Sequence, residues 1–297
     1  MPAWSLTESP VGSLVFPPNP PLVVAGRGLA FWVSGDFGLV SVAGKAVSLQ
    51  NHVFPINPNL GSLNNPPTDS GPTTGADSLD GVPGLSWPLP NGDGRQMYLG
   101  GIAQAAMKDT LGAFFGYGVG NRQPRTLISV IRPEFAAATF DITGGAVSTF
   151  SSNPNFEALF DLEDTVAANS FYLFSQAWRD PGPPGPALRG PATAGGVGGI
   201  YNGTPLVVEW SSNGFPDITV KINGVPVALS GAMPGVAGVG LNAYIFGSSG
   251  SGAVAQWRGS KFEELVYDVN MPDFPTEYRN LYLYLKGRYP SIALTVP

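Results

Sequence analysis

Short apolar segments separated by turn residues recur along most of the chain. Residues 29–33, 126–132, 206–210, 218–222 and 261–269 each show the alternation or the short apolar run of a β-strand. Among 297 residues, 40 glycines and 30 prolines separate such segments, and both residues break helices and favour turns. The pattern predicts one all-β domain built from many short antiparallel strands.

Further strands are expected on the same grounds at residues 38–49 (a hairpin bent at Gly44), 85–87, 96–99, 137–142, 171–175, 225–229 and 241–246. Asn223-Gly224 is a two-residue sequence typical of hairpin turns, so the strands on either side of it should pair. Residues 51–83 and 180–199 are rich in Gly, Pro, Asn and Ser, and they predict two long irregular loops.

The C-terminal segment shows a different period. Tyr278, Leu281, Tyr282 and Leu285 recur at the spacing of one helical face, which predicts a short helix. The expected N-cap and C-terminal stop of this helix are Thr276 and Gly287.

Residues 1–28 show little alternation and contain the sequence PPNPP, which favours an extended arm. Such an arm is either a solvated tail or a strap on a neighbouring subunit, and both alternatives stay open. Its apolar residues are the candidates for an assembly contact: Trp4, Leu14, Val15 and Phe16. The expected organisation is therefore an arm over residues 1–28 and a single domain over residues 29–297.

Charge and composition exclude several classes of protein. The net charge of −6 and scattered basic residues argue against a nucleic-acid partner. No run of about 18 apolar residues occurs, so no membrane span is expected. The chain has no cysteine, which excludes disulfides, thiolate metal sites and a cysteine nucleophile. The N-terminal sequence does not have the pattern of a secretory signal, so we expect synthesis in a cytoplasm.

Five segments in order resemble the concanavalin A-like (laminin-G-like) jelly-roll domains of many phage and bacterial surface proteins. They are GLAFWVSGDFGLVSVAGKAVSLQN, DGVPGLSWPLPNGDGRQMYL, TLISVIRP, DITVKINGVPVAL and WRGSKFEELVYDVNMPDFPTEYRNLYLYLKGRYP. The resemblance covers roughly residues 28–290. It implies an antiparallel jelly-roll β-sandwich with one short C-terminal helix, but one fold hosts many activities.

The adjacent carboxylates Glu263 and Glu264 are candidates for catalysis or for structure. Retaining glycosidases of this fold carry Glu-x-Asp-x-x-Glu on one strand, because two carboxyls must face the substrate together. The residues two positions after the pair are Leu265 and Val266, so this spacing is missing. The resemblance implies instead that Glu264 is a framework carboxylate whose partner is a backbone amide or a buried arginine; Arg132 is the second framework residue. No catalytic residue is expected.

Other polar and aromatic residues suggest binding rather than chemistry. The single histidine, His52, is expected on the surface, and no nucleophile elbow accompanies it. No cofactor or metal is expected, with calcium as the alternative at two acidic segments: Asp69, Asp77 and Asp80, or Asp161, Glu163 and Asp164. Exposed tryptophans beside polar loops would suit a glycan, and the candidates are Trp87, Trp178 and Trp257, with Trp210 on a strand.

Three functions follow from these observations. The favoured one is a non-enzymatic structural protein of a phage virion, namely a capsid decoration protein that docks through its arm and loops. It would be made in the host cytoplasm, contact other capsid or tail subunits, and form a homo-oligomer on the particle. The alternative is a lectin-like tail or fibre module that binds a surface glycan on the host. The third is a polysaccharide-degrading enzyme.

Overall fold

The structure is a computed structural model, and it describes part of the chain. The described residues are 18–21, 23–24, 27–50, 52–53, 62–64, 73–87, 99–100, 125–133, 150–151, 157–165, 170–177, 187–189, 203–214, 217–227, 243–246, 259–267 and 269–297. Residues 1–17, which hold the candidate assembly contact, lie outside this part. Val23–Val24, within the predicted arm, pairs with Arg27 and Gly28, and the division of the chain at residue 28 stays a prediction.

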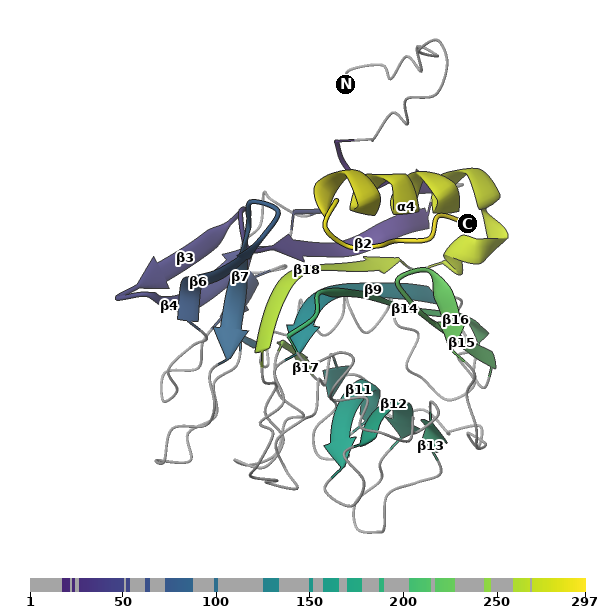
Figure 1. Cartoon of the computed structure of the whole chain (residues 1–297), viewed down its shortest axis with the longest axis horizontal. Helices are drawn as coiled ribbons and strands as arrows, with labels where there is room; N and C mark the ends of the chain where they lie inside the picture. The colour runs from purple at the N-terminus through teal and green to yellow at the C-terminus, as the bar shows by residue number, and fades with distance from the viewer. Residues whose placement is uncertain are drawn as a thin grey trace.

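The described elements are almost all strands (Figure 1). In chain order they are β1 (Val23–Val24), β2 (Arg27–Ser34), β3 (Leu39–Val42), β4 (Lys45–Gln50), β5 (Ser62–Asn64), β6 (Thr73–Leu79), β7 (Val82–Trp87), β8 (Leu99–Gly100), β9 (Arg125–Pro133), β10 (Phe150–Ser151), β11 (Glu157–Thr165), β12 (Ser170–Ala177), β13 (Ala187–Arg189), β14 (Leu206–Gly214), β15 (Asp217–Ile222), β16 (Val225–Val227), β17 (Ala243–Phe246) and β18 (Gly259–Tyr267). A 3-10 turn, η1 (Met271–Asp273), and the helix α4 (Pro275–Arg288) follow.

All described strand pairs are antiparallel, and most belong to one large sheet with the order β10-β17-β8-β5-β4-β6-β7-β18-β9-β14-β15-β16. Strands β11, β12 and β13 form a separate small sheet. Figure 1 shows α4 above the large sheet and the small sheet below it. The predicted fold class, an antiparallel β-sandwich with a short C-terminal helix, is confirmed. No helix among the described residues is long and apolar enough to cross a bilayer.

Strand β18 lies at the centre of the large sheet. It pairs with β9 along one edge and with β7 and then β2 along the other. Every residue of β18 is buried, as expected for a strand covered on both faces. A register shift between Lys261 and Glu263 marks a bulge, and it brings Phe262 into the same core cluster as Leu265 and Tyr267.

Helix α4 packs its buried residues on the face of the sheet that carries Phe262, Leu265 and Tyr267. Its contribution to the core comes from Tyr278, Leu281, Tyr282, Tyr284 and Leu285. Burial of each such side chain stabilises the fold by about 1.5–3 kcal/mol. The apolar face was predicted, but the ends of the helix were not.

The helix begins at Pro275, with Phe274 as its N-cap, instead of at a Thr276 cap. Proline suits the first helical turn because its fixed φ is helical and its missing N–H has no partner there. The helix continues through Gly287 to Arg288, where the side chain of Arg288 makes contacts with the sheet. The helix thus ends one residue after its expected stop.

Two-residue turns join three of the hairpins. Asn223-Gly224 joins β15 to β16, with φ values of 51° and 80°, as predicted. The bend at Gly44 is also confirmed, between β3 and β4. The loops expected over residues 51–83 and 180–199 are wrong in part, because β5, β6 and the start of β7 lie in the first and β13 lies in the second. Asp80-Gly81 joins β6 to β7 with φ values of 51° and 87°. Aspartate and glycine tolerate such positive φ values at low cost.

Candidate functional site

A tight turn at the end of β2 presents exposed polar and aromatic side chains, Asp36 and Phe37. Gly35 begins this turn, and its N–H donates to the carbonyl of Phe262 at 3.1 Å. A Cβ at this position would lie 1.9 Å from the carbonyl oxygen of Pro83, so only glycine fits. The close approach holds the turn against β7 and places Asp36 and Phe37 at its exposed tip.

Three rings stack beside this turn. The His52 ring lies on Trp32 at a centroid distance of 4.3 Å and an angle of 22°. Phe37 covers the same histidine at 4.0 Å, tilted by 38°. The backbone N–H of His52 donates to the carbonyl of Trp32 at 2.7 Å, which ties this segment to β2. Phe37 is 47% exposed, so the stack ends at an open aromatic face.

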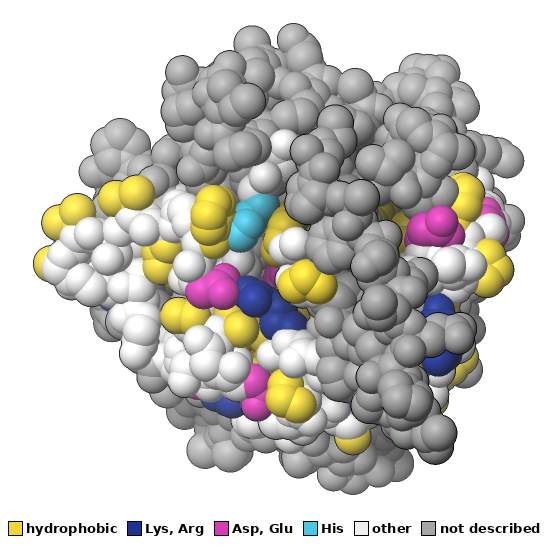
Figure 2. All heavy atoms as spheres, turned by 90° about the horizontal axis from the view of Figure 1, so that it is seen from above, with side chains coloured by type: hydrophobic (Ala, Val, Ile, Leu, Met, Phe, Trp, Pro, Cys, Tyr) yellow, Lys and Arg dark blue, Asp and Glu magenta, His cyan; other side chains and the backbone are white. Residues whose placement is uncertain are grey.

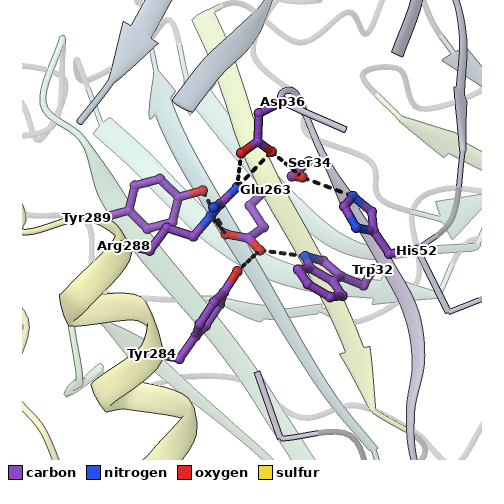
Figure 3. Close-up of polar contacts among 8 residues, drawn as sticks. All are labelled: Trp32, Ser34, Asp36, His52, Glu263, Tyr284, Arg288 and Tyr289. Atoms are coloured by element: carbon purple, nitrogen blue, oxygen red, sulfur yellow. Dashed lines mark hydrogen bonds and ion pairs between the residues drawn. The ribbon is translucent and has the colours of Figure 1, made fainter. Parts of the chain in front are cut away.

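A short chain of hydrogen bonds joins the histidine to the turn (Figure 3). The hydroxyl of Ser34 donates to Asp36 at 2.7 Å, and its oxygen lies 3.1 Å from Nε2 of His52. Because Ser34 has one hydroxyl proton, Nε2 of His52 is the donor in the second contact. His52 thus lies at the surface, half-buried and held by these contacts.

Burial lowers the pKa of His52 to about 4, the nearby charge of Arg288 adds to the decrease, and Asp36 opposes it. The imidazole is therefore neutral near pH 7. The described contacts of its ring include no carboxylate at Nδ1, so this is not the geometry of a Ser-His-Asp triad.

Arg288, at the end of α4, links this surface to the core. Its Nη2 donates to both carboxylate oxygens of Asp36, at 2.7 and 2.8 Å, and its Nε donates to Glu263 at 3.0 Å. Burial lowers the pKa of Arg288, but the Glu263 carboxylate, the neighbouring tyrosines and the bond to Asp36 together more than offset this, so the net direction is upward. Burial raises the pKa of Asp36, whereas bonds from Ser34 and Arg288 lower it by more. Both partners of the exposed pair are charged at neutral pH.

Glu263 is the centre of the buried part of this network. Its Oε1 accepts from Nε1 of Trp32 at 2.6 Å and from Tyr284 at 2.5 Å. Its Oε2 accepts from Arg288 and, at 2.7 Å, from the hydroxyl of Tyr289. Burial raises the pKa of Glu263, and these four donors oppose the rise. The side chain is 1% exposed and fully bonded, which makes it an anchor of α4 on the sheet.

A second buried carboxylate anchors the beginning of the helix. Glu209 on β14 is 0% exposed and accepts hydrogen bonds from the hydroxyls of Tyr278 and Tyr282. Ser211 donates to it at 3.1 Å, and Lys221 donates to the Tyr278 hydroxyl at 2.5 Å. Buried polar groups need such partners, and α4 therefore docks on the sheet in one fixed position.

The predicted framework residues lie elsewhere. Glu264 follows Glu263 on β18 and faces the opposite side of the sheet, where it pairs with Lys261 at 3.5 Å. Both side chains are fully buried. Arg132 forms an ion pair with Asp77 and lies 5.4 Å from the centre of the Phe262 ring. Lys261 is thus one partner of Glu264, and the framework roles of Glu264 and Arg132 stay predictions.

The candidate glycan residues Trp178 and Trp257 lie outside the described residues, as does the side chain of Trp87 on β7. Trp210 is 3% exposed. These three candidates therefore stay predictions.

The acidic segments proposed for calcium are partly described. Asp77 is bonded to Arg132, and Asp80 accepts from the N–H and hydroxyl of Ser291. The segment with Asp161, Glu163 and Asp164 is strand β11 instead of a loop, and its side chains lie outside the described part, as does Asp69. Within the part that is described, no three acidic or histidine side chains are placed to hold a metal.

Of these surface residues, only His52 was singled out from the sequence, whereas Asp36, Phe37 and Arg288 were not. The sequence SGDFG, residues 34–38, is typical of a turn between two strands and carries no recognisable binding motif. Turns generally lie at the surface, and this was the only signal that could have pointed to these residues. Asp36 and Arg288 are 252 positions apart, and no local pattern brings them together. Figure 2 shows the result on the surface: hydrophobic, acidic and basic side chains surround the histidine on one face.

No protein-family model matches the sequence, and neither does any curated protein. Among solved structures, Trypanosoma rangeli sialidase in complex with the inhibitor DANA is similar, with 14% identity and a TM-score of 0.50. The similarity covers 92% of this chain and 34% of the sialidase, so the chain spans about a third of that protein.

Two further solved structures are similar to this chain with TM-scores below 0.5. Domain 4 of a GH43 extracellular arabinanase from Geobacillus stearothermophilus, in complex with arabinotriose, has 15% identity and a TM-score of 0.43, over 81% of this chain and 93% of that one. The binding domain of Paraclostridial Mosquitocidal Protein 1 has 14% identity and a TM-score of 0.47, over 86% of this chain and 52% of that one.

The expectation of a non-enzymatic protein needs a correction. The fold on which that expectation rested is shared with part of a sialidase, which is an enzyme. A missing motif on one strand excludes one glycosidase arrangement and not the class, because function depends on the site and not on the fold. The chain thus shares its antiparallel β-sandwich fold with part of that sialidase.

Proposed function

We propose that this chain is a carbohydrate-binding β-sandwich domain, and that its sugar surface is formed by Phe37, His52 and Asp36. The observation that carries the proposal is the half-exposed Phe37 ring, stacked on His52 directly beside an exposed carboxylate. We call these three residues the aromatic shelf.

The shelf has the two chemical features that a sugar ring needs. A pyranose presents a face of C–H groups, which packs on an aromatic ring, and a rim of hydroxyls, which hydrogen-bond to polar side chains. Phe37 offers the ring, and the Asp36 carboxylate, with a side chain 36% exposed, offers strong acceptors.

The shelf is held in place before any ligand arrives. Ser34 and Arg288 hold the Asp36 carboxylate with three hydrogen bonds, and Trp32 supports the histidine from below. Side chains that are already ordered lose little entropy on binding, which favours affinity. The sialidase similarity supports the fold that carries the shelf and nothing beyond it.

The test is glycan binding by the full chain, first on an oligosaccharide array and then by calorimetry on the best ligand. Phe37→Ala should weaken binding at least about tenfold, because it removes the stacking surface. Val42→Ala is the matched control: this residue is 63% exposed on the next strand, and no described contact joins it to His52. An equal loss of glycan affinity in the two variants, or an array on which no glycan binds, would contradict the proposal.

We propose in addition that the protein works on a phage particle, as a decoration or a receptor-binding component that contacts other virion subunits and itself as a homo-oligomer. What supports this is the resemblance of the five sequence segments and the Pro-rich arm over residues 1–28. Mass spectrometry of purified particles tests it, since a virion component should be present in many copies. A protein found only in the lysate would not be a virion component.

A further inference from the structure

We infer that the aromatic shelf selects uncharged sugars and discriminates against sugars that carry a carboxylate. The inference rests on the proposed function and concerns its ligand class. Its basis is the arrangement of charges around Phe37 and His52, where the described cation, Arg288, is already bonded to two carboxylates.

The guanidinium of Arg288 is the cation described in contact with the shelf, and two carboxylates share it. Nε is bonded to Glu263, and Nη2 is bonded to both oxygens of Asp36. A carboxylate ligand needs an arginine fork with free donors to bind well. Here Nε and Nη2 are directed at protein carboxylates, so an acidic sugar that uses these donors would have to compete with Asp36 or Glu263.

The group that faces the ligand is instead an acceptor with a negative charge. Asp36 is ionised, because the bonds from Ser34 and Arg288 hold its pKa below the ordinary value despite its burial. Sugar hydroxyls are good donors to such a carboxylate, whereas a second carboxylate at the same place is repelled. The neutral His52 ring supplies no compensating positive charge near pH 7.

The shelf therefore combines a stacking ring with a fixed anionic acceptor. This combination recognises the hydroxyl rim of an uncharged sugar and opposes glucuronate, galacturonate and sialate residues. Replacing Asp36 by asparagine should remove the repulsion and also the negative charge that offsets the guanidinium of Arg288. The preference for uncharged over acidic sugars should then decrease for both of these reasons.

The test compares matched probes on the full chain at pH 7: cellobiose with cellobiouronic acid, and lactose with 3′-sialyllactose. We expect each acidic probe to bind at least about fivefold more weakly than its neutral partner. In Asp36→Asn, the ratio should fall towards one or reverse, while binding of the neutral probe weakens. Equal or tighter binding of the acidic probes by the unaltered chain would overturn the inference.

A second measurement uses only the unaltered chain, so it does not require that the Asp36→Asn variant folds. Repulsion between charges is screened by salt, so raising sodium chloride from about 20 mM to about 500 mM should reduce the selectivity of the unaltered chain. A selectivity that salt leaves unchanged would point to steric exclusion and overturn the electrostatic inference. If neither neutral nor acidic probes bind, the proposed function itself is wrong, and the two failures are thus distinguishable.

Discussion

Arg288 and Asp36 are 252 positions apart in the sequence and are joined by two hydrogen bonds of 2.7 and 2.8 Å. The same guanidinium bonds Glu263, which is 1% exposed. One side chain at the end of the last helix therefore connects the exposed shelf with the buried anchor of that helix. Both the stability of the fold and the shape of the shelf depend on it.

Replacing Arg288 by alanine should lower the free energy of unfolding by about 2–4 kcal/mol, because Glu263 loses its only described cationic partner while it stays buried. Urea denaturation measures the change. Arg279→Ala on the same helix is the control, since Arg279 is exposed and its loss should cost less than about 0.5 kcal/mol. Similar losses for the two variants would show that the Arg288 contacts contribute little.

Two buried tyrosine hydroxyls should behave in opposite ways. Tyr282 donates to Glu209, and Tyr282→Phe should cost about 1–3 kcal/mol, because the carboxylate loses a donor without access to water. The Tyr267 hydroxyl is buried and has no hydrogen-bond partner among the described residues. Tyr267→Phe should therefore be neutral or slightly stabilising. Thermal unfolding of both variants measures the difference, and a larger loss in Tyr267→Phe would contradict the described network.

Gly35→Ala should destabilise the fold by about 3 kcal/mol or more, since its Cβ would overlap the backbone carbonyl of Pro83, which has no rotamer to change. Gly75→Ala is the comparison. Gly75 has a φ of 71° and no atom within 4 Å of an added Cβ, so only the backbone strain of about 1–2 kcal/mol applies. The urea midpoints of the two variants show which one is less stable. A smaller loss of stability in Gly35→Ala than in Gly75→Ala would contradict the close approach of Gly35 to Pro83.

The single histidine predicts a pH dependence with a definite sign. The pKa of His52 is about 4 in the folded chain, against an ordinary value of 6.5. Between these values the unfolded chain binds more protons, so stability rises with pH from about 4 to 6.5 and falls as the pH decreases through this window. Because the ring is only half-buried, we expect a contribution of about 1 kcal/mol after allowance for solvent screening.

Urea denaturation at several pH values, for the unaltered chain and for His52→Gln, isolates this contribution. The acidic groups titrate in both proteins, so their effect cancels in the difference. The difference in unfolding free energy should change across the window and level off above pH 6.5. A constant difference would show that His52 has an ordinary pKa in the folded chain.

The sequence determined the local features of this protein. The two-residue turn at Asn223-Gly224 and the bend at Gly44 depend on the φ values that asparagine and glycine tolerate, and both lie where the sequence predicts them. The apolar face of α4 follows from a period of 3.6 residues. Such signals act over a few residues, so one sequence is enough to find them. The Asp80-Gly81 turn carried the same signal inside a segment interpreted as loop.

Only the tertiary structure decided the site. The four donors to Glu263 come from β2, from α4 and from the residue that follows the helix, and the pairing of β18 with β2 brings them together. Which carboxylate becomes an anchor and which one faces solvent is a matter of burial and of partners distant in the chain. No pattern of neighbouring residues contains that information, because these contacts exist only after the strands have paired.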